Sequence, residues 1–119
     1  MNDQAQIQHY ESPEDKAASI VARIKEEQPG IRLFQVVIPD DPTAIYIARK
    51  SSWSEYKTML GTVKNEAQAS ETIIQRFLVY PKPDYEAMQT EWDPGLIMTL
   101  AQQIQKGLGF TQGASVKNW

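Results

Sequence analysis

Prolines and glycines interrupt the C-terminal half of this chain at closely spaced points, and this pattern most constrains the fold. The interruptions are Pro81-Lys82-Pro83, Asp93-Pro94-Gly95, and Gly107 with Gly109. Proline stops a continuing helix but suits its first position, and glycine often follows the last helical residue. We therefore expect three short helical pieces between Phe77 and Phe110, including Asp84 to Trp92 and Pro94 to Leu108.

An amphipathic helix is predicted over residues 12–28. Ser12 is a suitable N-cap, and Pro13 suits the first helical position. Pro29-Gly30 ends the helix. Its apolar residues recur at helical spacing and form one stripe: Ala17, Ile20, Val21 and Ile24.

A β-hairpin is predicted next. The segments from Ile31 to Ile38 and from Thr43 to Arg49 are rich in β-branched and aromatic residues. Pro39-Asp40-Asp41-Pro42 lies between them and favours a tight antiparallel connection. Because an isolated hairpin is marginal in water, this one must pack on a helix or pair with a further strand.

Two more helices are predicted between the hairpin and the proline breaks. Ser52 or Ser54 can cap a helix that Gly61 weakens. The apolar residues of this helix are Trp53, Tyr56, Leu60 and Val63. A second helix, from Glu66 to Val79, has an apolar face wide enough to be central to the core. The predicted fold class is α+β, with an N-terminal helix, a β-hairpin and then a bundle of three to four short helices.

The length of 119 residues accommodates one domain. We expect a flexible lead-in over residues 1–11, a single α+β domain over 12–110 and a polar C-terminal tail over 111–119. The start of the chain lacks the basic and apolar regions of a signal peptide. No apolar stretch reaches the length of about 20 residues that spans a bilayer. We therefore expect a soluble protein without a membrane partner.

Charge and cysteine content exclude further classes of protein. The formal net charge is −3, and Lys and Arg are scattered along the chain, so no basic surface for nucleic acid is predicted. Cysteine is absent, which rules out disulfides and a thiol nucleophile.

The residues that could perform catalysis are few. His9 is the single histidine, and we interpret it as a solvated side chain because no orienting partner is evident. Asp40 and Asp41 are assigned to the turn, and Asp93 is assigned as the N-cap of the helix that Pro94 opens. Gly107 or Gly109 is expected to cap the end of that helix in the left-handed conformation, with Phe110 folding back onto it. We predict a protein that is not an enzyme, with no catalytic, cofactor or metal site.

Aromatic and apolar side chains are the remaining candidates for function. Trp92 is expected to fill the corner before Asp93, whereas Trp119 either extends into solvent or docks in another chain. The candidate residues for binding a partner protein are Trp53, Tyr56, Trp92, Leu96, Leu100 and Trp119.

The hairpin, the segment RKSSWSEYKTM and the stretch LVYPKPDYEAMQTEWDPGLIMTLAQQIQKGLGF together resemble the small tail assembly chaperones of tailed bacteriophages. The resemblance covers roughly residues 31 to 110. It includes Ile45 to Arg49 with Trp53 and Tyr56, followed by the proline corner, the acidic helix, Pro94-Gly95 and the last helix.

The resemblance implies a non-enzymatic chaperone or adaptor without a cofactor, which binds the tape-measure protein in the cytoplasm of the host cell during tail assembly. Its partners would be phage tail proteins. A homo-oligomer of this chain is the alternative assembly. The alternative function is a structural virion component of the tail, baseplate or head-to-tail connector. A third hypothesis, a small enzyme or a metal-dependent hydrolase, would depend on His9 and Asp40.

Overall fold

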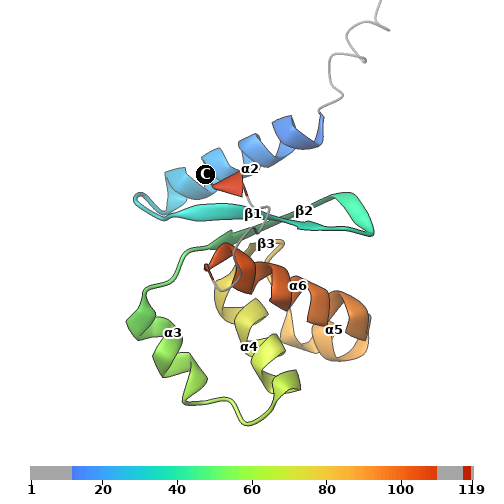
Figure 1. Cartoon of the computed structure of the whole chain (residues 1–119). Coiled ribbons are helices and arrows are strands. Elements are labelled where there is room, and N and C mark those ends of the chain that lie inside the picture. The colour runs from blue at the N-terminus through green and yellow to red at the C-terminus, as the bar shows by residue number, and fades with distance from the viewer. Residues whose placement is uncertain (1–11, 110–116, 119) are drawn as a thin grey trace, which may run out of the picture.

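The computed structural model describes residues 12–109 and 117–118. An antiparallel sheet has the strand order β3-β2-β1-β4, with helix α2 on one face and helices α3 to α6 on the other (Figure 1). The elements are α2 Pro13–Glu27, β1 Leu33–Ile38, β2 Asp41–Arg49, α3 Trp53–Leu60, α4 Glu66–Phe77, β3 Leu78–Tyr80, α5 Tyr85–Thr90, α6 Pro94–Gly107 and β4 Lys117–Asn118. The predicted fold class is confirmed: a helix, a hairpin and a set of short helices.

Helix α2 forms as its sequence predicts. The Ser12 hydroxyl accepts a hydrogen bond from the Asp15 backbone N–H at 3.1 Å, which satisfies one of the unpaired donors at the helix start. The predicted apolar stripe is buried against the sheet. Gly30, beyond the helix end, has φ 88°, a conformation that glycine adopts without a steric penalty.

The sheet separates two apolar clusters because successive strand residues point to opposite faces. Adjacent residues of β1 illustrate this: Leu33 packs in the α2 cluster and Phe34 in the cluster under α4 and α6. The α2 cluster comprises Ala17, Ile20, Val21, Ile24, Leu33, Ile45 and Ile47. The larger cluster contains Phe34, Val36, Ala48, Tyr56, Met59, Ile74, Phe77, Leu100 and Ile104 among others.

The prediction that the helix beginning at Glu66 continues to Val79 is wrong. Helix α4 ends at Phe77, and the next three residues form strand β3, in which Leu78 is opposite Ala48 and Tyr80 is opposite Ile47. The first of the three expected helical pieces is therefore a strand. Residues 78–80 are a short apolar run, which is compatible with both a helix and a strand. Pairing with the edge of β2 makes them a strand.

A short strand, β4, lies within the predicted polar tail. In its register with β1, Lys117 is opposite Gln35 and Asn118 is opposite Phe34. No strand was predicted here, because two paired residues carry no periodicity. Trp119 and Phe110 lie outside the described residues.

The helix ends differ in detail from their predictions. Helix α3 ends at Leu60 with Gly61 as its C-cap, so Val63 lies beyond it. Asp93 is the N-cap residue of α6, but its side chain makes no capping hydrogen bond. Gly109 has φ 101°, as predicted for a residue that ends a helix, whereas Gly107 is buried within α6. Among the described residues, no helix is both long and apolar enough to cross a bilayer.

Candidate functional site

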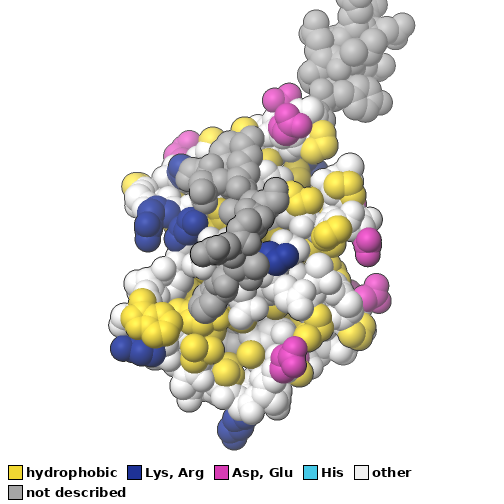
Figure 2. Space-filling view, viewed as in Figure 1, with side chains coloured by type: hydrophobic (Ala, Val, Ile, Leu, Met, Phe, Trp, Pro, Cys, Tyr) yellow, Lys and Arg dark blue, Asp and Glu magenta, His cyan; other side chains and the backbone are white. Residues whose placement is uncertain are grey.

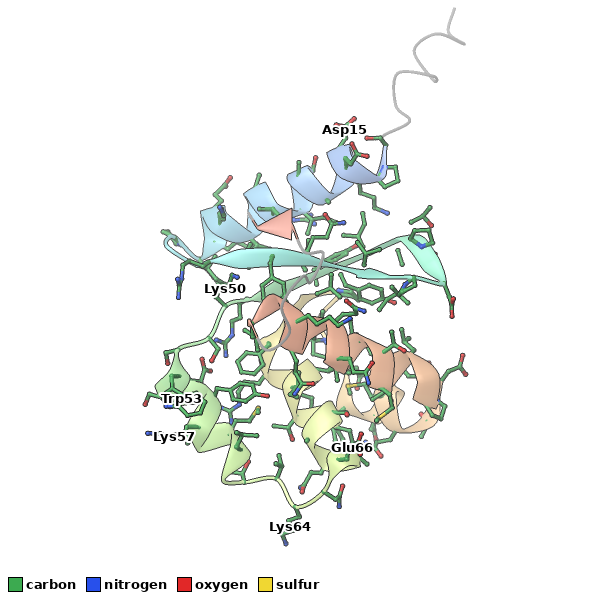
Figure 3. The ribbon with its side chains drawn as sticks, viewed as in Figure 1. Asp15, Lys50, Trp53, Lys57, Lys64 and Glu66 are labelled. Atoms are coloured by element: carbon green, nitrogen blue, oxygen red, sulfur yellow. The ribbon has the colours of Figure 1, made fainter. Side chains whose placement is uncertain are left out.

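The outer side of helix α3 exposes apolar side chains. Trp53 is 65% exposed and Leu60 is 42% exposed. These residues are seven positions apart, which is close to two helical turns, and Lys57 lies between them on the same side. We call Trp53, Lys57 and Leu60 the α3 face. Trp53 and Lys57 are labelled in Figure 3, and Figure 2 shows hydrophobic and basic side chains together in this part of the surface.

The opposite side of α3 is anchored in the core. Tyr56 is only 4% exposed and stacks on Phe77 with ring centroids 6.1 Å apart. The Gln105 side-chain amide donates a hydrogen bond to the Tyr56 hydroxyl at 3.1 Å. Met59 is fully buried. These contacts hold the helix in one orientation and so present the α3 face in a defined geometry.

A charged cluster joins α3 to the sheet and to α4. The Arg49 guanidinium donates two hydrogen bonds to the Glu55 carboxylate, at 2.9 and 2.6 Å, and its Nε donates to the Arg76 carbonyl at 3.2 Å. The hydrogen bonds from Arg49 lower the pKa of Glu55, and those to Glu55 raise the pKa of Arg49. Both groups are therefore charged at neutral pH, and this bidentate pair fastens the start of α3.

The predicted partner-binding residues that the structure describes do not form one surface, and Trp119 lies outside the described residues. Leu100 is completely buried and Tyr56 nearly so, and both belong to the core. Trp92 and Leu96 are half-buried and pack against the same cluster, which agrees with the expectation that Trp92 fills a corner. Of the predicted residues that the structure describes, only Trp53 has a mostly exposed side chain.

The exposed neighbour of Trp53 is Leu60, which was predicted as an apolar residue of the same helix as Tyr56. The structure divides the apolar residues of this helix between two sides, since Tyr56 and Met59 face the core while Trp53 and Leu60 face outward. A helical projection places Trp53 and Leu60 about 20° apart. This spacing can be read from the sequence. The sequence does not indicate which side of α3 is buried.

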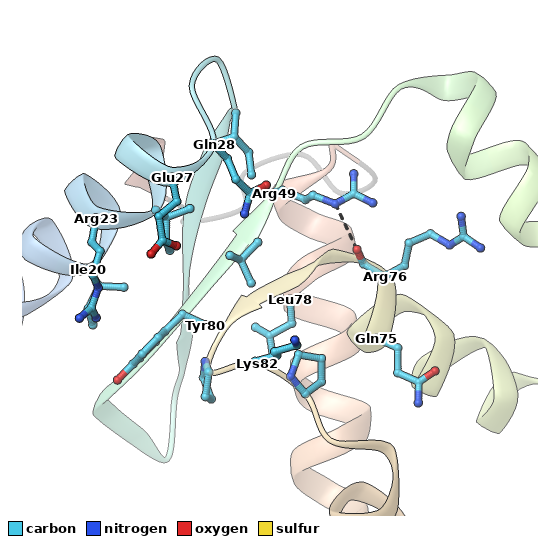
Figure 4. Close-up of a pocket in the computed structure, with 15 residues that line it drawn as sticks. Ile20, Arg23, Glu27, Gln28, Arg49, Gln75, Arg76, Leu78, Tyr80 and Lys82 are labelled. Carbon is cyan, nitrogen blue, oxygen red and sulfur yellow. Dashed lines mark hydrogen bonds between the residues drawn. The ribbon is translucent and has the colours of Figure 1, made fainter.

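A second feature is a groove of about 710 Å³ between α2 and the edge strand β3 (Figure 4). We call it the β3 groove. Helix α2 provides one wall, β3 lies along the groove, and the segment 81–83 and the end of α4 complete it. Its apolar lining includes Ile20, Ile24, Ile31, Val79 and Tyr80. The groove was not predicted from the sequence because its walls come from segments more than 50 residues apart.

The charged residues that line the β3 groove are mostly basic. They are Arg23, Arg49, Arg76, Lys82 and Glu27. Figure 4 shows the guanidinium groups of Arg49 and Arg76 turned away from α2, and both contact Glu55. Arg23 and Lys82 are exposed and form no ion pair within residues 12–109 and 117–118. The groove therefore carries uncompensated positive charge although the whole chain has a net charge of −3.

The side chains considered for catalysis are not brought together. Asp40 and Asp41 are both exposed, but only Asp40 lies in the turn as predicted: Asp41 is the first residue of β2, opposite Ile38, and its carboxylate accepts a hydrogen bond from the Thr43 hydroxyl at 3.2 Å. His9 lies outside the described residues. Across the described ranges, no group of three or more His, Cys, Asp or Glu side chains is placed to hold a metal ion.

Comparison of the chain with protein-family models, with curated proteins and with solved structures finds no match.

Proposed function

We propose that this protein acts by binding another protein through the α3 face, as a non-enzymatic adaptor or assembly chaperone. The observation that carries the proposal is the exposure of Trp53 on a helix whose other side is fastened to the core. Tryptophan is among the residues that contribute most to binding energy at protein interfaces, especially when the surrounding structure is preorganised. Leu60 extends the apolar surface along the helix, and Lys57 supplies a charge between them.

The resemblance in sequence to tail assembly chaperones supports a more specific proposal. The partner is the tape-measure protein of a bacteriophage tail, and binding takes place in the host cytoplasm. An amphipathic helix can lay its apolar face in a groove of a helical partner, which suits the geometry of Trp53 and Leu60. The competing proposal is a structural component of the tail, baseplate or connector that uses the same surface in the finished particle.

The test is co-purification of the tagged full chain from infected cells, comparing wild type with Trp53→Ala. The matched control is Tyr85→Ala, because Tyr85 is another exposed aromatic residue, at 54%, on a different helix. We expect wild type and the control to recover the tape-measure protein, and Trp53→Ala to weaken binding by about 30-fold or more, the effect of losing a central anchor. Equal recovery with all three proteins would refute the role of the α3 face.

Folding of the variants is checked by circular dichroism and urea unfolding. Truncation of exposed side chains normally changes stability by no more than about 0.5 kcal/mol, so a loss of binding by folded Trp53→Ala reports on the interface.

Analysis of purified particles by mass spectrometry separates the two proposals. An assembly chaperone is absent from the finished particle, whereas a structural component is present in stoichiometric copies. Recovery of the chain with partners unrelated to a phage would refute the tail-assembly proposal. The role of Trp53 would then be tested by whether Trp53→Ala weakens binding to those partners.

A further inference from the structure

We propose that the β3 groove is a second binding site, which takes an extended acidic segment of a partner protein. The groove shares no residue with the α3 face, so this proposal stands independently of the function proposed above. It depends on the shape of the groove and on its charge.

The shape of the groove favours an extended chain. Strand β3 is at one end of the strand order, so one of its edges has no neighbouring strand among the described residues, and α2 packs chiefly on the adjacent strand β2. Val79 and Tyr80 are only half-buried there, next to Ile20 and Ile24 on α2. A segment that alternates apolar and acidic residues would place its apolar side chains on this floor and its carboxylates at the rim, because strand side chains alternate between two faces.

The charge of the groove favours an acidic occupant. Arg23 on α2 and Lys82 beyond β3 come from opposite walls, and neither has an ion-pair partner among the described residues. Arg76 also lines the groove, but its guanidinium is turned away from α2 and lies 3.9 Å from the Glu55 carboxylate, so the positive charge of the groove depends on Arg23 and Lys82. Glu27 is the one acidic residue in the lining and opposes the binding of an anion. Electrostatic complementarity of this kind mainly determines which partner is accepted and how fast it binds.

The probe for this site is a fluorescent peptide of about ten residues that alternates glutamate and valine, a length of about 33 Å when extended. The control peptide has lysine in place of every glutamate. Binding to the full chain is followed by fluorescence anisotropy up to about 1 mM peptide, and the site is located from backbone amide shifts. We expect saturable binding of the acidic peptide, shifts at Ile24, Val79 and Tyr80, and weakening at high salt. No binding of the acidic peptide, or shifts confined to other surfaces, overturns the proposal.

Charge variants make the test specific. Arg23→Glu with Lys82→Glu should weaken binding about tenfold, whereas Lys64→Glu with Lys106→Glu makes the same change of net charge outside both the groove lining and the α3 face and should leave binding within about twofold. An equal effect of both pairs would show that only the net charge matters, and would overturn the proposal.

Removal of the opposing acid gives a prediction of opposite sign. Glu27→Gln should strengthen binding of the acidic peptide about two- to fivefold. The control is Glu26→Gln, because Glu26 is also exposed but lies outside the groove lining. Preference for the lysine peptide, or weaker binding by Glu27→Gln, would identify a basic occupant and refute the proposal.

A second copy of this chain is the other occupant to test. Sedimentation of the wild type and of Arg23→Glu with Lys82→Glu distinguishes it. Self-association that the double variant abolishes would assign the groove to a homo-oligomer and overturn the assignment to an acidic segment. A wild type that stays monomeric while it binds the acidic peptide supports the proposal.

Discussion

Substitution of Gly107 by alanine should destabilise the protein, although the same change normally stabilises a helix. Gly107 lies in the last turn of α6, and a Cβ atom built there would overlap with the ring of Phe34. Phe34 is fully buried, and the Lys50 ammonium lies 5.1 Å from its ring centroid. The ring therefore has no open space into which it could move, and the backbone of α6 has to shift away from the sheet.

The expected size of the effect follows from two opposing contributions. Replacing glycine by alanine within a helix contributes about 1 kcal/mol of stability. Overpacking a tight core costs about 1–3 kcal/mol, and the upper end applies to Gly107 because three ring carbons would be too close. The free energy of unfolding should therefore fall by about 2 kcal/mol, which moves the urea midpoint down by about 1 M.

The control is Gly95→Ala in the same helix. A Cβ atom at Gly95 meets nothing within 4 Å, so this change should raise the free energy of unfolding by about 0.4–1 kcal/mol. Combining Gly107→Ala with Phe34→Leu should cost less than the sum of the two single changes, since the smaller side chain relieves the overlap. A Gly107→Ala protein as stable as wild type would refute this account of how α6 packs on the sheet.

Three further predictions concern single contacts. Glu55→Gln should lower the free energy of unfolding by about 1 kcal/mol at neutral pH. Because the hydrogen bonds from Arg49 lower the pKa of Glu55 in the folded state, the stabilisation is present at neutral pH and is lost as pH falls below the ordinary glutamate pKa of about 4.3 and through the lowered pKa, so the unfolding free energies of the two proteins should converge in acid. Lys50→Met should cost about 1 kcal/mol in urea unfolding, since it removes the hydrogen bond of 3.0 Å to the Gly107 carbonyl and the contact with the Phe34 ring; no loss would contradict both roles. Asn65→Ala should cost about 1 kcal/mol because its side chain caps α4, whereas Asp93→Ala should cost only about 0.3 kcal/mol because its side chain makes no capping bond; equal losses in thermal unfolding would refute this distinction.

The elements that were predicted correctly are those with a strong local signal. Helix α2 combines a cap, a proline at its first turn and a continuous apolar stripe, and it spans residues close to those expected. The hairpin has β-branched runs on either side of a proline-rich turn. Each of these signals depends on neighbours in the chain, so it can be recognised before the fold is known.

The candidate sites were less predictable because they depend on which surfaces are left uncovered. Trp53 was identified from its residue type, but Tyr56 and Leu100 were expected at the same surface and are buried instead. The β3 groove depends on strand β3, whose residues Leu78 and Val79 were predicted as the end of the helix that begins at Glu66. The resemblance to tail assembly chaperones stays a prediction, and its test is the identity of the partner.

The proline and glycine breaks illustrate the division between local and tertiary control. Local chemistry determines where α5 and α6 begin and where α6 ends, since proline cannot continue a helix and glycine can reverse its last turn. It does not determine that residues 78–80 pair with β2, or that Gly107 lies under Phe34. Those outcomes come from hydrogen bonds and packing between segments far apart in the chain, which exist only once the sheet and its helices have assembled.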